Sequence, residues 1–203
     1  MNRQTRGLIK DFTVLFQHLW YRDFPMSALV QGKMDEKFGA ASWTTHIAGC
    51  VKGVGDLMGY LTHFEHAGRF DAVIKDFDQN CGERAITHLE WEWKQPAMLG
   101  ERFNEVEKLV AARGRALFST LITYSRHEKD ADNRSIIERQ WGDGPEPLLV
   151  QFVTFTYKNG RRHLGQLSAE LFVNGKWRTL RVQEALPWNR PGSKWFNPEE
   201  PSA

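Results

Sequence analysis

The stretch that decides the fold is residues 69–96, RFDAVIKDFDQNCGERAITHLEWEWKQP. Two largely apolar runs, 70–77 and 84–94, flank the polar segment DQNCGE at 78–83. Runs of this length, separated by turn-forming residues, are typical of an antiparallel hairpin, and Pro96 is expected to end the second strand. The sequence therefore predicts two neighbouring core strands joined by a loop of several residues.

The second predicted strand has two faces of different character. Side chains two residues apart on a strand point to the same face, so Glu90, Glu92 and Lys94 share one face. The alternate positions are apolar: Leu89, Trp91 and Trp93. We expect the apolar face to pack against a helix and the charged face to meet solvent or a cleft.

The first predicted strand adds a third carboxylate. The start of one hairpin strand lies beside the end of the other, so Asp71 is expected opposite the Glu90–Lys94 end. Carboxylates gathered in this way repel one another unless a cation or a proton lies between them. Oxygen ligands suit a hard cation, Mg²⁺ or Mn²⁺, and a nearby lysine can orient a water or stabilise charge on a phosphate.

The same charged face has a second, purely structural interpretation. Opposite charges on adjacent strands often form salt-bridge ladders that bind no ion. The candidate partners for such a ladder are Lys75, Arg84 and Arg69. Both interpretations stay open on the residues alone.

The segments around the hairpin predict a mixed fold. Helical spacing of apolar residues predicts helices at 8–22 and 101–113, and a continuous apolar strand follows at 117–124. Further helices are expected at 27–38, 43–61 and 130–141; the glycines of 43–61 indicate tight packing or irregular backbone.

The last third of the chain predicts an antiparallel meander. Asn159-Gly160 and Asn174-Gly175 are strong hairpin-turn signals. The strands expected around them are 148–157, 163–173 and 176–182. The predicted fold class is α+β, or mixed α/β, around one central sheet.

The expected domain organisation is one domain over residues 1–186 with a short tail. Within it we expect N-terminal helices at 8–38, a core at 43–125 and a β-meander at 148–183. Residues 187–203 are rich in Pro, Gly, Asn and Glu, which predicts an extended or disordered tail.

The pattern GRFDAVI, a hairpin, EWEWK, an amphipathic helix and a buried strand resembles the PD-(D/E)xK nuclease superfamily, the restriction-endonuclease-like fold. The signature of that family is an Asp on one core strand and a (D/E)-x-K triplet on the next. Here these are Asp71 and Glu92-Trp93-Lys94. The resemblance covers about residues 43–125, and Phe70 stands where the family often has Pro.

This resemblance implies a central mixed sheet flanked by helices and a Mg²⁺- or Mn²⁺-dependent endonuclease or exonuclease that hydrolyses DNA. It implies Asp71 and Glu92 as metal ligands, with Lys94 beside the attacking water. The family often adds an earlier acidic residue, for which Glu65 and Asp56 are candidates, Glu65 being nearer in sequence to the strand. Glu90 is a candidate second ligand.

Basic residues suggest where DNA would lie. Lys108, Arg113 and Arg115 flank the predicted helix at 101–113, and a further group surrounds the Asn159-Gly160 turn: Lys158, Arg161 and Arg162. A basic hairpin tip can bind phosphates, although turn solubility and protection of a sheet edge explain the same residues. Many nucleases of this kind dimerise, so a homodimer is possible.

Composition sets broad limits. Of 203 residues, 41% are hydrophobic and 26% charged, and the formal net charge is +2, which permits DNA binding without requiring it. The two cysteines, Cys50 and Cys81, form no metal motif, and a cytoplasmic setting is expected. No apolar run reaches the ~20 residues of a membrane helix. The alternative function is a non-catalytic nucleic-acid-binding or protein-interaction protein, on the same fold with the site unused.

Overall fold

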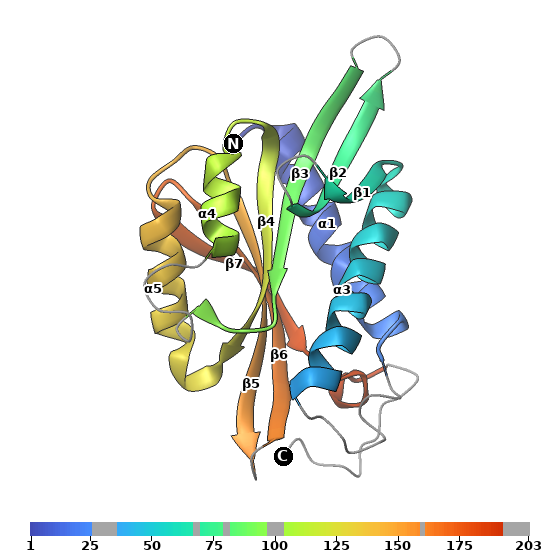
Figure 1. The fold of residues 1–203 in the computed structure, drawn as a ribbon, viewed down its shortest axis with the longest axis vertical. Coiled ribbons are helices and arrows are strands. Elements are labelled where there is room, and N and C mark those ends of the chain that lie inside the picture. The colour runs from blue at the N-terminus through green and yellow to red at the C-terminus, as the bar shows by residue number, and fades with distance from the viewer. Residues whose placement is uncertain (26–35, 67–69, 79–81, 97–103, 159–160, 193–203) are drawn as a thin grey trace.

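The computed structural model describes residues 1–25, 36–66, 70–78, 82–96, 104–158 and 161–192. Its centre is a seven-stranded mixed sheet whose strands lie in chain order (Figure 1). The strands are β1 (Leu61–His66), β2 (Phe70–Asp78), β3 (Gly82–Glu92), β4 (Ala116–Arg126), β5 (Leu148–Lys158), β6 (Arg161–Val173) and β7 (Lys176–Glu184).

The direction of each strand follows from its connection. Short links join antiparallel neighbours, whereas β3, β4 and β5 run parallel and are joined by crossovers that contain helices. The helices are α1 (Arg3–Arg22), α3 (Glu36–Met58), α4 (Asn104–Ala111) and α5 (Asp130–Trp141), with short 3₁₀ turns at His127–Lys129 and Pro187–Asn189. The predicted mixed architecture around one sheet is therefore confirmed.

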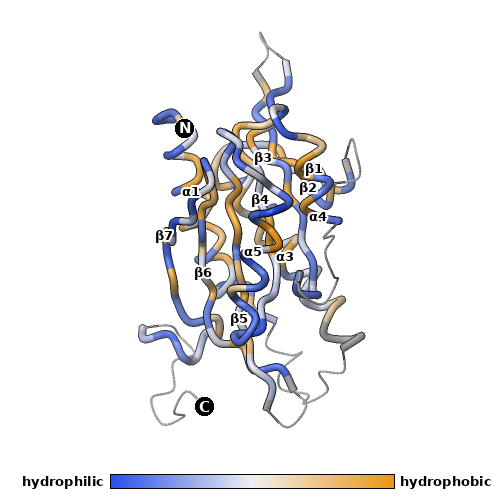
Figure 2. Tube along the Cα trace, turned by 90° about the vertical axis from the view of Figure 1, so that its left-hand side faces the viewer, coloured by the Kyte–Doolittle hydropathy of each residue, from blue (hydrophilic) through white to orange (hydrophobic). Residues whose placement is uncertain are grey.

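Helices cover both faces of the sheet (Figure 1). Helices α1 and α3 pack on one face, around Phe16, Trp20 and Trp43. Helices α4 and α5 pack on the other, around Leu109 and Trp141. Figure 2 shows the hydrophobic residues concentrated on the central strands between these layers, so the functional residues of the two faces are separated by the sheet.

Most predicted elements are present, with shifted ends. The hairpin of β2 and β3 and the meander of β5, β6 and β7 are confirmed. Strand β3 ends at Glu92, two residues before the predicted end. The predicted helix 27–38 falls largely on residues 26–35, outside the described residues, and α3 begins at Glu36.

The glycines of α3 allow tight packing, the first of the two explanations expected for them. A Cβ built on Gly53 would lie 2.8 Å from Leu19 Cδ1 of α1, and one on Gly55 would collide with the Thr62 hydroxyl. Since side chains stand in both spaces, Gly permits α3 to approach α1 and β1 closely.

The tail prediction is wrong for residues 187–192. The chain there forms a 3₁₀ turn, Pro187 is buried, and the Trp188 ring packs edge-on against Phe24 with centroids 5.8 Å apart. Burial of a large aromatic ring outweighs the polar composition of the segment. Residues 193–203 lie outside the described residues.

Within the described part of the chain, none of the helices combines the length and apolar character needed to cross a membrane.

Candidate active site

The site is built on the register of β2 and β3. Ala72 pairs with Leu89, and one further antiparallel step places Asp71 beside Glu90. Each of the two carboxyl groups shifts the pKa of the other, so the side chains of Asp71 and Glu90 lie close together. The position predicted for Asp71, opposite the end of β3, is therefore confirmed.

Helix α4 packs on the face of the sheet that carries Glu90. Its Val106 and Leu109 are fully buried, which fixes the helix on β3 and β4. Lys108 then reaches down to Glu90, with Nζ 2.9 Å from Oε2. Glu105 lies one turn earlier on the same helix, at the i, i+3 spacing that brings two side chains to one face.

These groups form one electrostatic unit, which we call the carboxylate cluster: Asp71, Glu90, Glu92 and Glu105, with Lys108. The side chain of Glu90 is 0% exposed, whereas that of Lys108 is 38% exposed. Among the described residues, four carboxyl groups thus share the ammonium group of Lys108. The cluster carries more acidic groups than its cation can neutralise.

Burial shifts the protonation of the cluster. Loss of hydration raises the pKa of Glu90 to about 8; Lys108 opposes this rise and the nearby Asp71 adds to it. Burial also raises the pKa of Asp71 and of Glu105. For Lys108, burial is the largest single influence and acts to lower the pKa, but the hydrogen bond to Glu90 and the nearby carboxylate charges together outweigh it, so the pKa rises. The cluster therefore holds protons that a bound cation could replace.

Two carboxylate oxygens in the cluster are buried without a hydrogen-bond partner: Oε1 of Glu90 and Oε2 of Glu105. Two other oxygens of the cluster have partners, since Glu90 Oε2 binds Lys108 and Asp71 Oδ2 accepts the Trp91 backbone N–H at 2.8 Å. Buried polar atoms are normally satisfied, so orphaned acceptors indicate an absent donor or cation.

Lys94 does not lie where the sequence placed it. Because β3 ends at Glu92, Lys94 is in a bend, is exposed, and donates its backbone N–H to Glu92 Oε1 at 2.8 Å. The Trp93 carbonyl accepts a hydrogen bond from Arg162, which ends the ladder there. The ammonium group beside the buried carboxylates is that of Lys108.

The other predicted ligands take different positions. Glu92 is half-buried and close enough to raise the pKa of Asp71. Glu65 is exposed, on β1 at a positive φ of 50°, in the region that L-residues rarely adopt. Asp56 pairs with Lys52 on α3, which covers the opposite face of the sheet, so it is not part of the site.

Within the residues that the structure describes, the salt-bridge ladder expected as the alternative does not involve Glu90. Lys75 binds Glu83 at 2.6 Å, and Arg84 pairs in register with Asp76, both at the other end of the hairpin. The ion pair of Glu90 comes from α4. Arg69 lies outside the described residues.

The predicted DNA-binding residues divide into three groups. Arg113 donates to the Trp141 carbonyl and stacks 4.3 Å over the Trp141 ring, and Arg162 stacks 4.2 Å over Trp93, so both have structural contacts. Arg115 is exposed. The side chains of Lys158 and Arg161 lie outside the described residues.

Sequence reasoning considered Lys108 only as a basic residue that could contact DNA, and it did not consider Glu105. The signal lay in the amphipathic helix, where both stand beside the buried positions Val106 and Leu109. A charged residue at the edge of a buried helical face lies close to the sheet below it. Which carboxylate Lys108 contacts depends on how α4 docks on β3, and the sequence alone does not show this.

The donor set suits a hard cation, but the observed geometry is not a preformed metal centre. No group of three or more His, Cys, Asp or Glu side chains is placed to hold a metal ion among the residues that the structure describes. Carboxylate oxygens, two of them orphaned, are nevertheless the ligands that Mg²⁺ and Mn²⁺ prefer. Binding would require the carboxyl groups to lose protons and turn toward the ion.

The chain matches no protein-family model, and a search of curated proteins finds no similar sequence.

Proposed function

We propose that this protein is a metal-dependent phosphodiesterase that hydrolyses DNA at the carboxylate cluster. The observation that carries the proposal is the pair of orphaned, buried carboxylate oxygens, Glu90 Oε1 and Glu105 Oε2, beside Asp71 and Lys108. An excess of buried carboxyl groups is costly unless a cation or protons compensate it, and such sites are often functional.

The arrangement of elements supports the same proposal. An Asp on β2, a Glu at the end of β3 and a helix that leads into the parallel strand β4 follow the order of the nuclease pattern. The mixed sheet with helices on both faces is consistent with the restriction-endonuclease-like fold. The specific fold remains part of this proposal.

Each residue of the cluster has a proposed role. Asp71 and Glu90 would hold the cation, and Glu92 and Glu105 would add further negative charge near it. The bound cation supplies an activated water and stabilises charge on the phosphoryl oxygens. The chain's own contribution is to hold these carboxyl groups in place, through the Trp91 N–H bond to Asp71 and the packing of α4, so that a cation can displace their protons.

Lys108 takes the role that the resemblance implied for Lys94. It is the cation in contact with Glu90, and its partly exposed ammonium can also reach a phosphate oxygen. A lysine in this position stabilises the negative charge that develops on the phosphoryl group during hydrolysis. Lys94 is expected to contribute little, because its exposed side chain stands in a bend beyond the strand.

The test is a plasmid-nicking assay with Mg²⁺, Mn²⁺ or EDTA. We expect metal-dependent nicking that Asp71→Asn and Glu90→Gln abolish and that Lys108→Met reduces at least 100-fold. Lys94→Met and the exposed-surface control Asp132→Asn should retain activity. Nicking that persists in Glu90→Gln would place the chemistry elsewhere.

The absence of a preformed three-ligand group within the described residues favours the second candidate, a non-catalytic binding protein. On that account the carboxylate cluster is a buried ion pair with protonated neighbours. No cleavage of supercoiled, nicked or single-stranded DNA, together with no Mn²⁺-induced change in melting temperature, would support it over the nuclease.

A further inference from the structure

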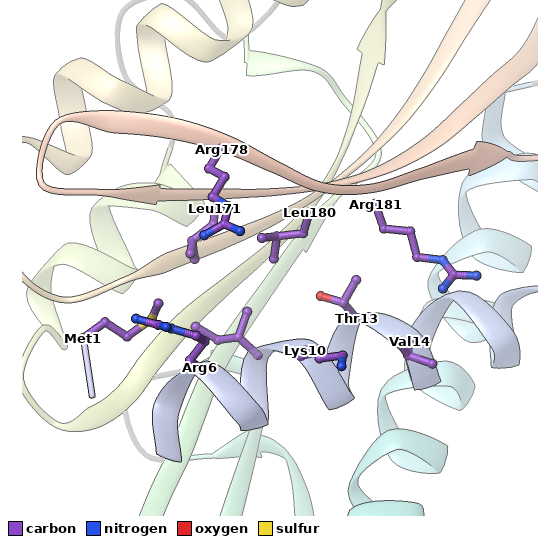
Figure 3. A pocket seen from close by; sticks show the side chains of 10 residues that line it. Met1, Arg6, Lys10, Thr13, Val14, Leu171, Arg178, Leu180 and Arg181 are labelled. Atoms are coloured by element: carbon purple, nitrogen blue, oxygen red, sulfur yellow. The ribbon is translucent and has the colours of Figure 1, made fainter. Parts of the chain in front are cut away.

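A second candidate site lies on the opposite face of the sheet, between α1 and the β6–β7 hairpin. A pocket of about 350 Å³ opens there (Figure 3). We call it the basic groove and define it by its cations, Arg6, Lys10, Arg178 and Arg181, and by its apolar floor, Ile9, Val14, Leu171 and Leu180. The volume lies in the range of small-molecule sites.

The two walls of the groove supply cations from separate elements. Arg6 and Lys10 are four residues apart on α1, a spacing that puts both on one helix face. On β7, Ala169 pairs with Arg181 and Glu170 with Thr179, which leaves Leu180 as the extra residue of a β-bulge. A bulge redirects side chains, and here Arg178 and Arg181 both line the pocket.

The charges of the groove are uncompensated. None of the described lining residues is acidic, and none of the four cations forms an ion pair within the described part of the chain. All four side chains are exposed. Basic side chains that face one another without counter-charges are suited to bind an anion, and arginine forks match phosphate geometry.

One buried polar atom also lines the groove. Thr13 follows Lys10 on the same helix face, is 3% exposed, and its Oγ1 has no hydrogen-bond partner. A hydroxyl can donate to an anionic oxygen or accept from a ligand hydroxyl. The unpartnered Thr13 Oγ1 therefore points to a ligand with polar atoms near the floor of the groove.

We propose that the basic groove binds a soluble phosphate monoester with a short aliphatic body. The phosphate lies between the α1 and β7 cations, and the aliphatic part lies on Ile9, Leu171 and Leu180. The described lining contains no aromatic ring on which a base would stack, which favours this ligand over single-stranded nucleic acid. The proposal does not depend on the nuclease function, because the sheet separates the two sites.

The test is isothermal titration calorimetry of the full chain with hexyl phosphate, inorganic phosphate and hexanol. We expect hexyl phosphate to bind at least tenfold more tightly than inorganic phosphate, and hexanol not to bind. Arg178→Gln/Arg181→Gln and, separately, Lys10→Gln should weaken hexyl phosphate at least tenfold. The charge-matched control Arg84→Gln/Arg139→Gln, at exposed positions outside the groove, should bind as the parent does.

Thr13→Val separates a ligand contact from a general charge effect, because it keeps the shape of the side chain and removes the hydroxyl. We expect it to weaken hexyl phosphate several-fold without lowering the melting temperature. Equal affinity for phosphate and hexyl phosphate, equal weakening by the control pair, or binding of a DNA oligonucleotide in place of hexyl phosphate would each overturn the proposal.

Discussion

The carboxylate cluster and the basic groove differ in how their charges are compensated. The carboxylate cluster is enclosed between α4 and the sheet, and its charges are neutralised by one ammonium group and by protons. The basic groove lies open between α1 and β7, and water solvates its cations. Charge removal should therefore destabilise the first region and stabilise the second, because only the first depends on its internal ion pair.

The largest change in stability is expected when the Lys108 ammonium group is removed from the buried carboxylates. Lys108→Met removes the counter-charge of buried Glu90, whose pKa is about 8 with Lys108 present, so the free energy of unfolding should fall by about 2 kcal/mol at pH 10. At pH 5 the loss should be smaller, because Glu90 then holds its proton. Urea denaturation at both pH values measures the change; an equal loss at Lys94→Met would contradict the assignment.

The second predicted effect is a pH dependence of the free energy of unfolding, measured in EDTA so that no metal ion is bound. The folded protein holds the Glu90 proton up to about pH 8, whereas the unfolded chain releases it near 4.5. Stability from this group is therefore full below pH 4.5 and is lost as the pH rises toward 8, by up to about 1.4 kcal/mol per pH unit. Glu90→Gln should flatten the plot of unfolding free energy against pH, and Asp132→Asn should not. A plot for Glu90→Gln that runs parallel to that of the parent protein would contradict the buried, protonated state of Glu90.

A third, smaller effect separates two neighbouring arginines. Arg113→Gln loses the stacking on Trp141 and the bond to its carbonyl, so stability should fall by about 1 kcal/mol. Arg115→Gln, at an exposed position, should leave stability unchanged but lower DNA affinity uniformly across sequences, reducing the salt slope by about 1. Chemical denaturation measures the stability of both variants, and fluorescence anisotropy measures their DNA affinity. A stability loss in Arg115→Gln and an affinity loss in Arg113→Gln would contradict these roles.

The smallest effect should have the opposite sign and lie in the basic groove. Arg181→Gln removes one of four mutually repelling cations, so stability should rise by a few tenths of a kcal/mol at low ionic strength. The gain should disappear in 0.5 M salt, because salt shortens the screening length roughly threefold and weakens the repulsion between the cations. Thermal melts at two ionic strengths measure it, and a loss of stability would show that Arg181 has a structural contact.

Sequence patterns predicted the antiparallel hairpins of the sheet better than the positions of the charged side chains near the end of β3. Alternation and turn residues located the hairpin and the meander, because both signals are local. They misplaced Lys94, since the end of β3 depends on Arg162, nearly seventy residues later in the chain. They did not reveal that Lys108 contacts Glu90, because the docking of α4 on the sheet sets this contact and leaves no periodic signal in the sequence.

The most direct test of the central claim is Mn²⁺ binding, measured by titration calorimetry at pH 7 in buffers of different ionisation enthalpy. The account predicts saturable binding by the parent protein with release of protons, because the ion displaces protons from Glu90 and its neighbours. Glu90→Gln should lose most of the affinity and of the proton release. Absence of binding, or binding unchanged in Glu90→Gln, would contradict a metal site at the carboxylate cluster.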